Sequence, residues 1–167
     1  MTEFEVYQQL IAFLTSARWT IVCASPPGGT DNRYHKCILP REDWAGSEKG
    51  LRDEVDLIAH DGSVVLLVEC KATLRDSLTV LNTYGESDRA KLLRIARSFT
   101  PIHLAELLRR ASGVSVPSVP AVALALAVGV VDCAAPADLS VFAFASPAPR
   151  LLTVEPLLDR LSPPRPD

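Results

Sequence analysis

Two β-type segments joined by a tight turn are the feature that most restricts the fold of this chain. Residues 53–59 and 64–71 are rich in apolar side chains, and they flank the tetrapeptide His60-Asp61-Gly62-Ser63. An Asp-Gly pair between two such segments is a strong signal for a β-hairpin, because glycine readily adopts the backbone conformations that tight turns need. We therefore expect a hairpin with its turn centred on Asp61 and Gly62.

The predicted pairing gathers charged side chains at the end of the hairpin away from the turn. With this turn, Glu54 lies opposite Glu69 and Asp56 lies opposite Leu67. Side chains alternate between the faces of a strand, so these residues and Lys71 share one face. The other face is apolar and consists of Val55, Leu57, Ala59, Val64, Leu66, Val68 and Cys70. Asp56 and Glu69 are then diagonal neighbours within reach of a common ion.

Carboxylates grouped in this way need a partner of opposite charge. Glu54, Asp56 and Glu69 repel one another unless a cation or basic side chains offset their charge. Mg²⁺ prefers such oxygen ligands. Lys71 could orient or deprotonate an attacking water, or neutralise charge on a phosphate. A solvated ion-pair face is the alternative, but the run from Leu66 to Val68 is apolar on both faces and favours a buried central strand.

The rest of the chain predicts further helices and strands around this hairpin. Helices are expected at 3–17, 74–81, 87–99, 100–111 and 153–161, and further strands at 19–23, 36–39, 121–131 and 139–145. The order predicts one layered α/β domain over residues 1–161. Residues 162–167 carry three prolines and are expected to form a frayed tail.

The charged residues of the hairpin carry a family resemblance. Asp56, twelve intervening residues and then Glu69-Cys70-Lys71 after an apolar strand resemble the motif of the PD-(D/E)XK nuclease superfamily. Val55 stands where that motif has proline. The resemblance implies a restriction-endonuclease-like core, in which helices flank a mixed central sheet in the order α-β-β-β-α-β.

The resemblance also implies a role for each motif residue. Asp56 and Glu69 would bind Mg²⁺, for which Mn²⁺ can substitute, the backbone carbonyl of Cys70 would add a ligand, and Lys71 would assist the attacking water. Glu54 is an accessory acid in this interpretation. Some members of the superfamily add an acid from the leading helix, for which Glu5 is the candidate. For Glu5 we prefer the alternative, a capping box with Thr2 at the start of that helix.

A basic stripe lies on the helix expected at 87–99. Lys91, Arg94 and Arg97 follow one another at intervals of three, so they share one helix face. They could contact nucleic-acid phosphates, but we favour a solvated face. Lys91 could also reach the catalytic strand, because the helix after that strand packs near it in the superfamily.

Charge and composition limit the partners. The formal net charge of −3 argues against a surface that binds nucleic acid everywhere. DNA binding would then depend on a local basic patch or a larger protein partner, and cutting both strands would favour a homodimer. The four cysteines are scattered and residues 1–9 do not resemble a signal peptide, so we expect a cytoplasmic protein with free thiols. Residues 114–131 lack charge but are interrupted by prolines and serines, so we expect no membrane span.

These observations predict a Mg²⁺-dependent nuclease that hydrolyses phosphodiester bonds in DNA, in restriction, repair or defence against mobile elements. Two alternatives stay open. One is a catalytically silent module of the same fold that binds nucleic acid or a protein partner. The other is a small α/β interaction protein whose motif is a coincidence.

Overall fold

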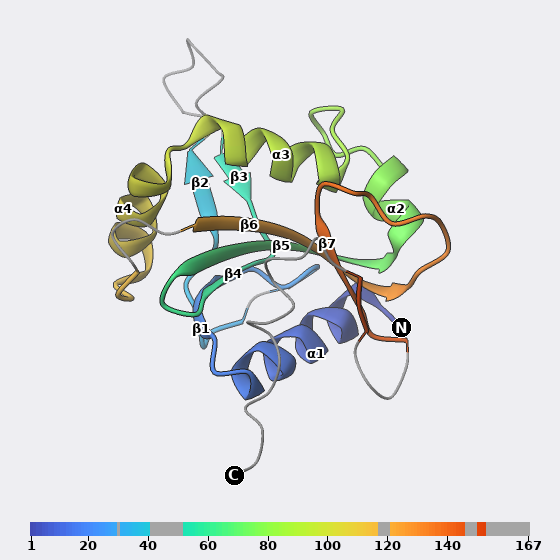
Figure 1. Cartoon of the computed structure of the whole chain (residues 1–167), viewed down its shortest axis with the longest axis horizontal. Helices are drawn as coiled ribbons and strands as arrows, with labels where there is room; N and C mark the ends of the chain where they lie inside the picture. The colour runs from blue at the N-terminus through green and yellow to red at the C-terminus, as the bar shows by residue number, and fades with distance from the viewer. Residues whose placement is uncertain (30, 41–51, 117–120, 146–149, 153–167) are drawn as a thin grey trace.

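The computed structural model describes residues 1–29, 31–40, 52–116, 121–145 and 150–152 (Figure 1). Within these residues, the helices are α1 (Glu3–Ser16), α2 (Leu74–Thr79), α3 (Asp88–Ser98) and α4 (Pro101–Ser112). The strands in the same residues are β1 (Thr20–Ala24), β2 (Ile38–Pro40), β3 (Arg52–Glu54), β4 (Leu57–His60), β5 (Val64–Thr73), β6 (Ala121–Val130), β7 (Ser140–Ala143) and β8 (Arg150–Leu152).

The described strands form a mixed main sheet with the order β1-β4-β5-β6-β7-β8. β5, β6 and β7 are parallel, whereas β1, β4 and β8 join the sheet through antiparallel pairings. The parallel pairing of β5 with β6 requires a crossover, which α2, α3 and α4 provide. β2 and β3 pair with each other in a separate small sheet. The expected α/β class, with a mixed sheet flanked by helices, is confirmed.

β5 is the central strand and is covered on both faces. Figure 1 shows α1 on one side of the sheet and α3 on the other. Leu66 and Val68 pack with the apolar side of α1, whereas Leu67 packs with Leu92 and Ile95 of α3. The three β5 residues are completely buried. The prediction of a buried central strand is therefore confirmed, and the alternative of a solvated face is wrong for Glu69, of which only 3% is exposed, whereas Glu54 is exposed.

The hairpin forms, but its register differs from the prediction by two residues. Leu57 pairs with Val68, and the turn is centred on Gly62 and Ser63. Gly62 has a φ of +101°, a conformation that favours glycine. The Asp61 carboxylate accepts a hydrogen bond from the backbone N–H of Ser63 at 2.9 Å. This side-chain contact holds Asp61 at the start of the turn instead of its centre.

The first predicted strand of the hairpin is divided in two. Residues 52–54 form β3 against β2, and β4 begins only at Leu57. The backbone N–H of Val55 donates a hydrogen bond to the carbonyl of Cys37 at 2.9 Å. This contact draws the chain toward β2 before it enters the main sheet. Val55 consequently packs on the α3 side of the sheet, not in the predicted apolar face beneath α1.

The other predicted elements within the described residues are confirmed apart from small shifts at their ends. Side-chain hydroxyls of Thr2, Ser87 and Thr100 cap α1, α3 and α4, and Gly113 ends α4 in a left-handed conformation. β8 was not predicted. The helix expected at 153–161 and the tail 162–167 lie outside the described residues. No helix in the described ranges is long and apolar enough to cross a membrane.

Candidate active site

Asp56 lies in the short break between β3 and β4, beside the middle of β5. Its Oδ2 accepts a hydrogen bond from the backbone N–H of Cys70 at 2.7 Å. Continuing the β4–β5 register by two residues beyond the pairing of Ile58 with Leu67 places Asp56 opposite Glu69. The corrected register therefore brings the two predicted metal ligands into a directly opposed position on neighbouring segments.

Glu69 is a buried acid within an otherwise apolar strand. Only 3% of the residue is exposed, and it points to the same face of β5 as Leu67 and Lys71. Its Oε2 lies 2.7 Å from Nζ of Lys91, which comes from α3. Its buried Oε1 has no hydrogen-bond partner among the described residues. A buried carboxylate oxygen without a donor is costly, so this atom is a natural ligand for a cation.

Two lysines face these carboxylates from different elements. Lys71 lies on β5, and its Nζ is 3.4 Å from Oε1 of Glu3 and 4.0 Å from Oδ2 of Asp88. Lys91 is held by Glu69 and also donates a hydrogen bond to the backbone carbonyl of Glu54 at 3.0 Å. Both ammonium groups are therefore bound to acceptors of the chain itself. The expectation that Lys91 reaches the strand carrying Glu69 is confirmed.

The pKa values of the two opposed acids are raised. Burial raises the pKa of the Asp56 carboxyl to about 6, although the hydrogen bond from Cys70 and the lysine charges limit the rise. Burial also raises the pKa of Glu69 well above its usual range, and the neighbouring charge of Asp56 adds to that rise. The site is thus short of positive charge when both acids are ionised.

Both lysines stay protonated. Burial lowers the pKa of Lys71, but the carboxylates of Asp88 and Glu3 outweigh this effect and leave the pKa above its ordinary value. For Lys91, burial likewise lowers the pKa, and Glu69 more than restores it. A lysine that keeps its proton cannot take one from water. Two of the roles expected for Lys71 therefore stay open: orienting the water and neutralising charge on a phosphate.

The charged groups line a single open cleft of about 490 Å³. Its acidic side chains are Glu3, Glu54, Asp56, Glu69 and Asp88, and its basic ones are Lys36, Lys71 and Lys91. The loop 25–29 after β1 forms part of the wall. Glu54 lies at the rim with 53% of its side chain exposed. The buried acids Asp56 and Glu69 thus share a cleft with three lysines, a combination suited to a phosphate group and a cation together.

Glu5 does not belong to this cleft. Its carboxylate accepts a hydrogen bond from the backbone N–H of Thr2 at 2.7 Å, and its own N–H donates to the Thr2 hydroxyl at 3.2 Å. The preferred capping-box interpretation is confirmed, and the metal-ligand interpretation of Glu5 is wrong. The cap instead orients the first turn of α1 so that Glu3 faces Lys71.

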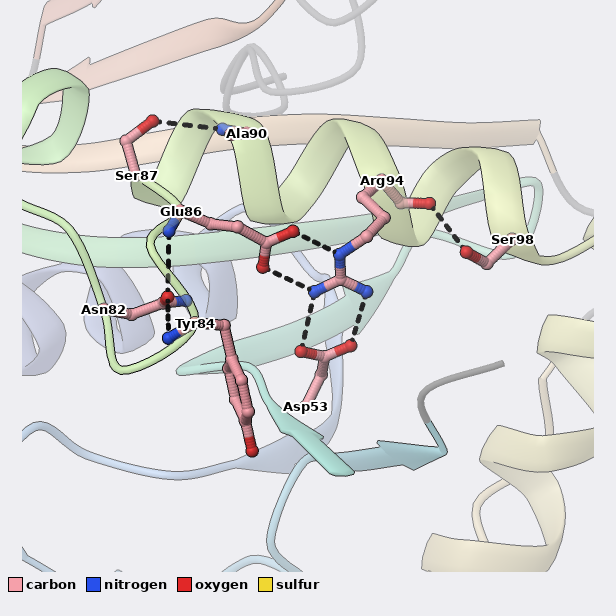
Figure 2. A network of polar contacts seen from close by, with 8 residues as sticks. All are labelled: Asp53, Asn82, Tyr84, Glu86, Ser87, Ala90, Arg94 and Ser98. Carbon is pink, nitrogen blue, oxygen red and sulfur yellow. Dashed lines mark hydrogen bonds and ion pairs between the residues drawn. The ribbon is translucent and has the colours of Figure 1, made fainter. Parts of the chain in front are cut away.

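The basic stripe on α3 is divided among three environments. Lys91 enters the cleft, and Arg97 is exposed to solvent. Arg94 lies between two acids: it forms two hydrogen bonds of 2.8 Å to Asp53 and two to Glu86 (Figure 2). Only 17% of the Arg94 side chain is exposed. Arg94 therefore binds α3 to β3. The prediction that Arg94 contacts nucleic acid is wrong, and so is the solvated position that we favoured for it.

Glu3 and Asp88 are site residues that the sequence analysis missed. Each is the first residue of its helix, directly after the capping residues Thr2 and Ser87. Acids at this position are common because they favour the positive end of the helix dipole. Nothing in the sequence shows that the starts of α1 and α3 meet at the same part of β5. Only the packing of both helices on the sheet reveals their common contact with Lys71.

A metal ion would need ligands beyond the protein side chains. Among the described residues, no group of three or more His, Cys, Asp or Glu side chains is arranged to hold an ion. Asp56 and Glu69 are two carboxylates, and Mg²⁺ is commonly held by one or two carboxylates, with water and substrate oxygens completing its shell. The unsatisfied Oε1 of Glu69 and the raised pKa values of both acids fit such an ion.

Comparison with known protein families, with characterised proteins and with solved structures finds no match for this chain. The residues of the cleft therefore carry the functional conclusion by themselves. They supply two opposed acids, two partly buried lysines and an open approach from solvent. This combination suits the binding of an anionic substrate next to a cation.

Proposed function

We propose that this chain is a divalent-metal-dependent nuclease with a restriction-endonuclease-like fold, and that it hydrolyses phosphodiester bonds in DNA. One observation carries the proposal: Asp56 and Glu69 face each other in a cleft lined by lysines, and the buried Oε1 of Glu69 has no hydrogen-bond donor among the described residues. Two carboxylates in this position are unfavourable for the stability of the fold, because each raises the free-energy cost of ionising the other.

The order of elements supports the proposed fold. α1, β1, β4, β5, α3 and β6 follow the order α-β-β-β-α-β, with the small β2–β3 sheet, α2 and α4 as additions. Asp56 precedes β4, and Glu69-Cys70-Lys71 lies on the central strand β5. These are the places where the motif of the PD-(D/E)XK superfamily would put its acids and its lysine.

The residues that would hold Mg²⁺ or Mn²⁺ are Asp56, Glu69 and the backbone carbonyl of Cys70, and Glu54, at the rim of the same cleft, would be the accessory acid. A divalent cation held there would supply charge stabilisation for the phosphate and would lower the pKa of a water molecule. Lys71 keeps its proton and offsets negative charge on the scissile phosphate. Lys36, half exposed at the rim, attracts the nucleic-acid backbone toward the cleft.

Affinity for DNA is expected to depend on more than this cleft. The chain has a net charge of −3, so a larger protein partner or a second copy of the chain would supply further phosphate contacts. A homodimer would also place two clefts on the two strands of a duplex. The free thiols of Cys23, Cys37, Cys70 and Cys133 fit a reducing cytoplasm.

A catalytically silent module of the same fold is the second candidate, and one contact favours it. The ammonium group of Lys91 already neutralises Glu69 at 2.7 Å, so the acidic pair is partly satisfied without any ion. In this candidate function the cleft binds nucleic acid or a protein without hydrolysis. Cleavage assays separate the two candidates.

The test is incubation of the protein with plasmid, linear and single-stranded DNA and with RNA, in the presence of Mg²⁺ or Mn²⁺. We expect cleavage by the wild type, and a loss of at least about 100-fold in Glu69→Ala and in Lys71→Ala. Glu106→Ala is the matched control, because this half-exposed glutamate lies on α4 outside the cleft. The proposed enzyme activity would be contradicted if no substrate is cleaved and if the metal causes no stabilisation that Glu69→Ala removes. Stabilisation without cleavage would favour the silent module.

A further inference from the structure

The contact between Lys91 and Glu69 has a consequence for the proposed metal site. Lys91 is not part of the motif that the sequence analysis identified, yet it makes the shortest ion pair to either of the opposed acids among the contacts in the described residues. Its Nζ also binds the carbonyl of Glu54, in the segment that leads to Asp56. The Lys91 ammonium group thus contacts both the side chain of Glu69 and the segment that leads to Asp56.

Lys91 is held in this position by the fold. Only 13% of its side chain is exposed. One helical turn further along α3, Arg94 binds Asp53 through two hydrogen bonds and so fixes the helix against β3 (Figure 2). Because Arg94 holds the helix against β3, the Lys91 ammonium group lies next to Glu69 in the cation-free protein.

We propose that Lys91 is an internal counter-ion which competes with a divalent cation for Glu69, and that it thereby weakens and sets the metal affinity of the cleft. This inference rests on the proposed function for the identity of the metal ligands. A cation that binds between Asp56 and Glu69 meets the like charge of Lys91 and must displace it from Oε2 or share that carboxylate with it. Lys91 is then a positioning residue, since it acts through Glu69.

The inference predicts opposite effects on two properties. Removing the Lys91 charge leaves a buried acidic pair without its counter-ion, so the cation-free protein becomes less stable. The same change removes a repulsive charge from the cation site, so Mn²⁺ binds about 10-fold to 100-fold more tightly. Replacing a residue with a merely structural role would reduce the stability of the protein without strengthening its binding of the cation.

The experiment is a calorimetric titration of MnCl₂ into cation-free protein, combined with thermal unfolding at increasing MnCl₂. Lys91→Met and Lys91→Gln are compared with the wild type. The glutamine variant keeps a hydrogen-bond donor and serves where the methionine variant does not fold without cation. Lys91→Arg keeps the charge and should bind Mn²⁺ like the wild type. Arg89→Met is the matched control, because it also loses an ion pair of α3, that with Asp138, but does not line the cleft.

Tighter Mn²⁺ binding by the uncharged Lys91 variants, with no such gain in Arg89→Met, supports the inference. It is also supported if only those variants bind Mn²⁺. Equal or weaker binding by the uncharged variants overturns it, and so does a lack of Mn²⁺ binding by every variant. Failure of the proposed nuclease function is distinct: it appears as absence of cleavage, even when the Lys91 variants bind Mn²⁺ more tightly.

Discussion

Replacement of Arg94 by methionine tests how strongly α3 is fastened to the segment that carries Asp56. Arg94 makes two hydrogen bonds of 2.8 Å to Asp53, whose side chain is only 2% exposed. Removing one partner of a buried ion pair costs about 3 to 5 kcal/mol, because the other charge remains buried. The Glu86 side chain is 18% exposed, so solvent partly compensates for its lost contact. We therefore expect a loss of about 3 kcal/mol in the free energy of unfolding.

Urea denaturation of the cation-free protein measures this loss. Arg97→Met is the control, because Arg97 lies on the same helix but is exposed, and its replacement should change the free energy of unfolding by no more than about 0.5 kcal/mol. Adding Asp53→Asn to the Arg94 variant should recover part of the loss, since it removes the buried charge left behind. Equal stabilities of Arg94→Met and Arg97→Met would refute the assigned role of Arg94.

Three further predictions concern pH, packing and the two acids of α1. Burial raises the pKa of Asp56 from 3.8 to about 6, so the cation-free protein should be more stable at pH 4 than at pH 7. The protonated carboxyl stabilises the folded state at low pH. This contribution, up to about 3 kcal/mol in the free energy of unfolding, is lost as the pH rises through 6. Asp56→Asn should flatten this part of a urea-unfolding pH profile, and an unchanged profile would contradict the burial. A Cβ atom at Gly129 would lie 2.9 Å from a backbone oxygen of β5. Gly129→Ala should therefore destabilise the protein by about 1 to 3 kcal/mol in thermal unfolding. Gly29→Ala is the control and should not destabilise it, because a Cβ atom there meets open space. Glu3→Gln should reduce the cleavage rate through Lys71, whereas Glu5→Ala, which removes the side-chain acceptor of the capping box, should lower the melting temperature and leave the rate unchanged; the reverse result would show that the two acids are assigned wrongly.

The elements of the fold could be predicted from sequence where local chemistry determines them. Thr2, Ser87 and Thr100 mark helix starts because their hydroxyls bind backbone N–H groups a few residues away. The hairpin follows from Gly62 and its apolar flanks. Its register could not be predicted in the same way, because the Asp61 side chain and a contact between distant segments, β2 and β3, decide where each strand begins.

The candidate site could be predicted only as far as its motif. Asp56, Glu69 and Lys71 lie on neighbouring segments, so strand alternation is enough to group them. Lys91 was recognised as able to reach them, but the packing of α3 decides that it binds Glu69 while Arg94 binds Asp53. Which acid each of these two basic side chains binds depends on long-range contacts, which no local sequence pattern records.

The central claim is that Asp56 and Glu69 together support hydrolysis of a phosphodiester bond. Its most direct test is the single-turnover cleavage rate of DNA by the wild type and by Glu69→Gln, each with Mg²⁺ and with a chelator. The glutamine keeps the size of the side chain and removes its charge. We predict Mg²⁺-dependent cleavage by the wild type and a rate lower by at least about 100-fold in a folded Glu69→Gln variant. Equal rates for the two proteins, or no cleavage by either, would contradict the claim.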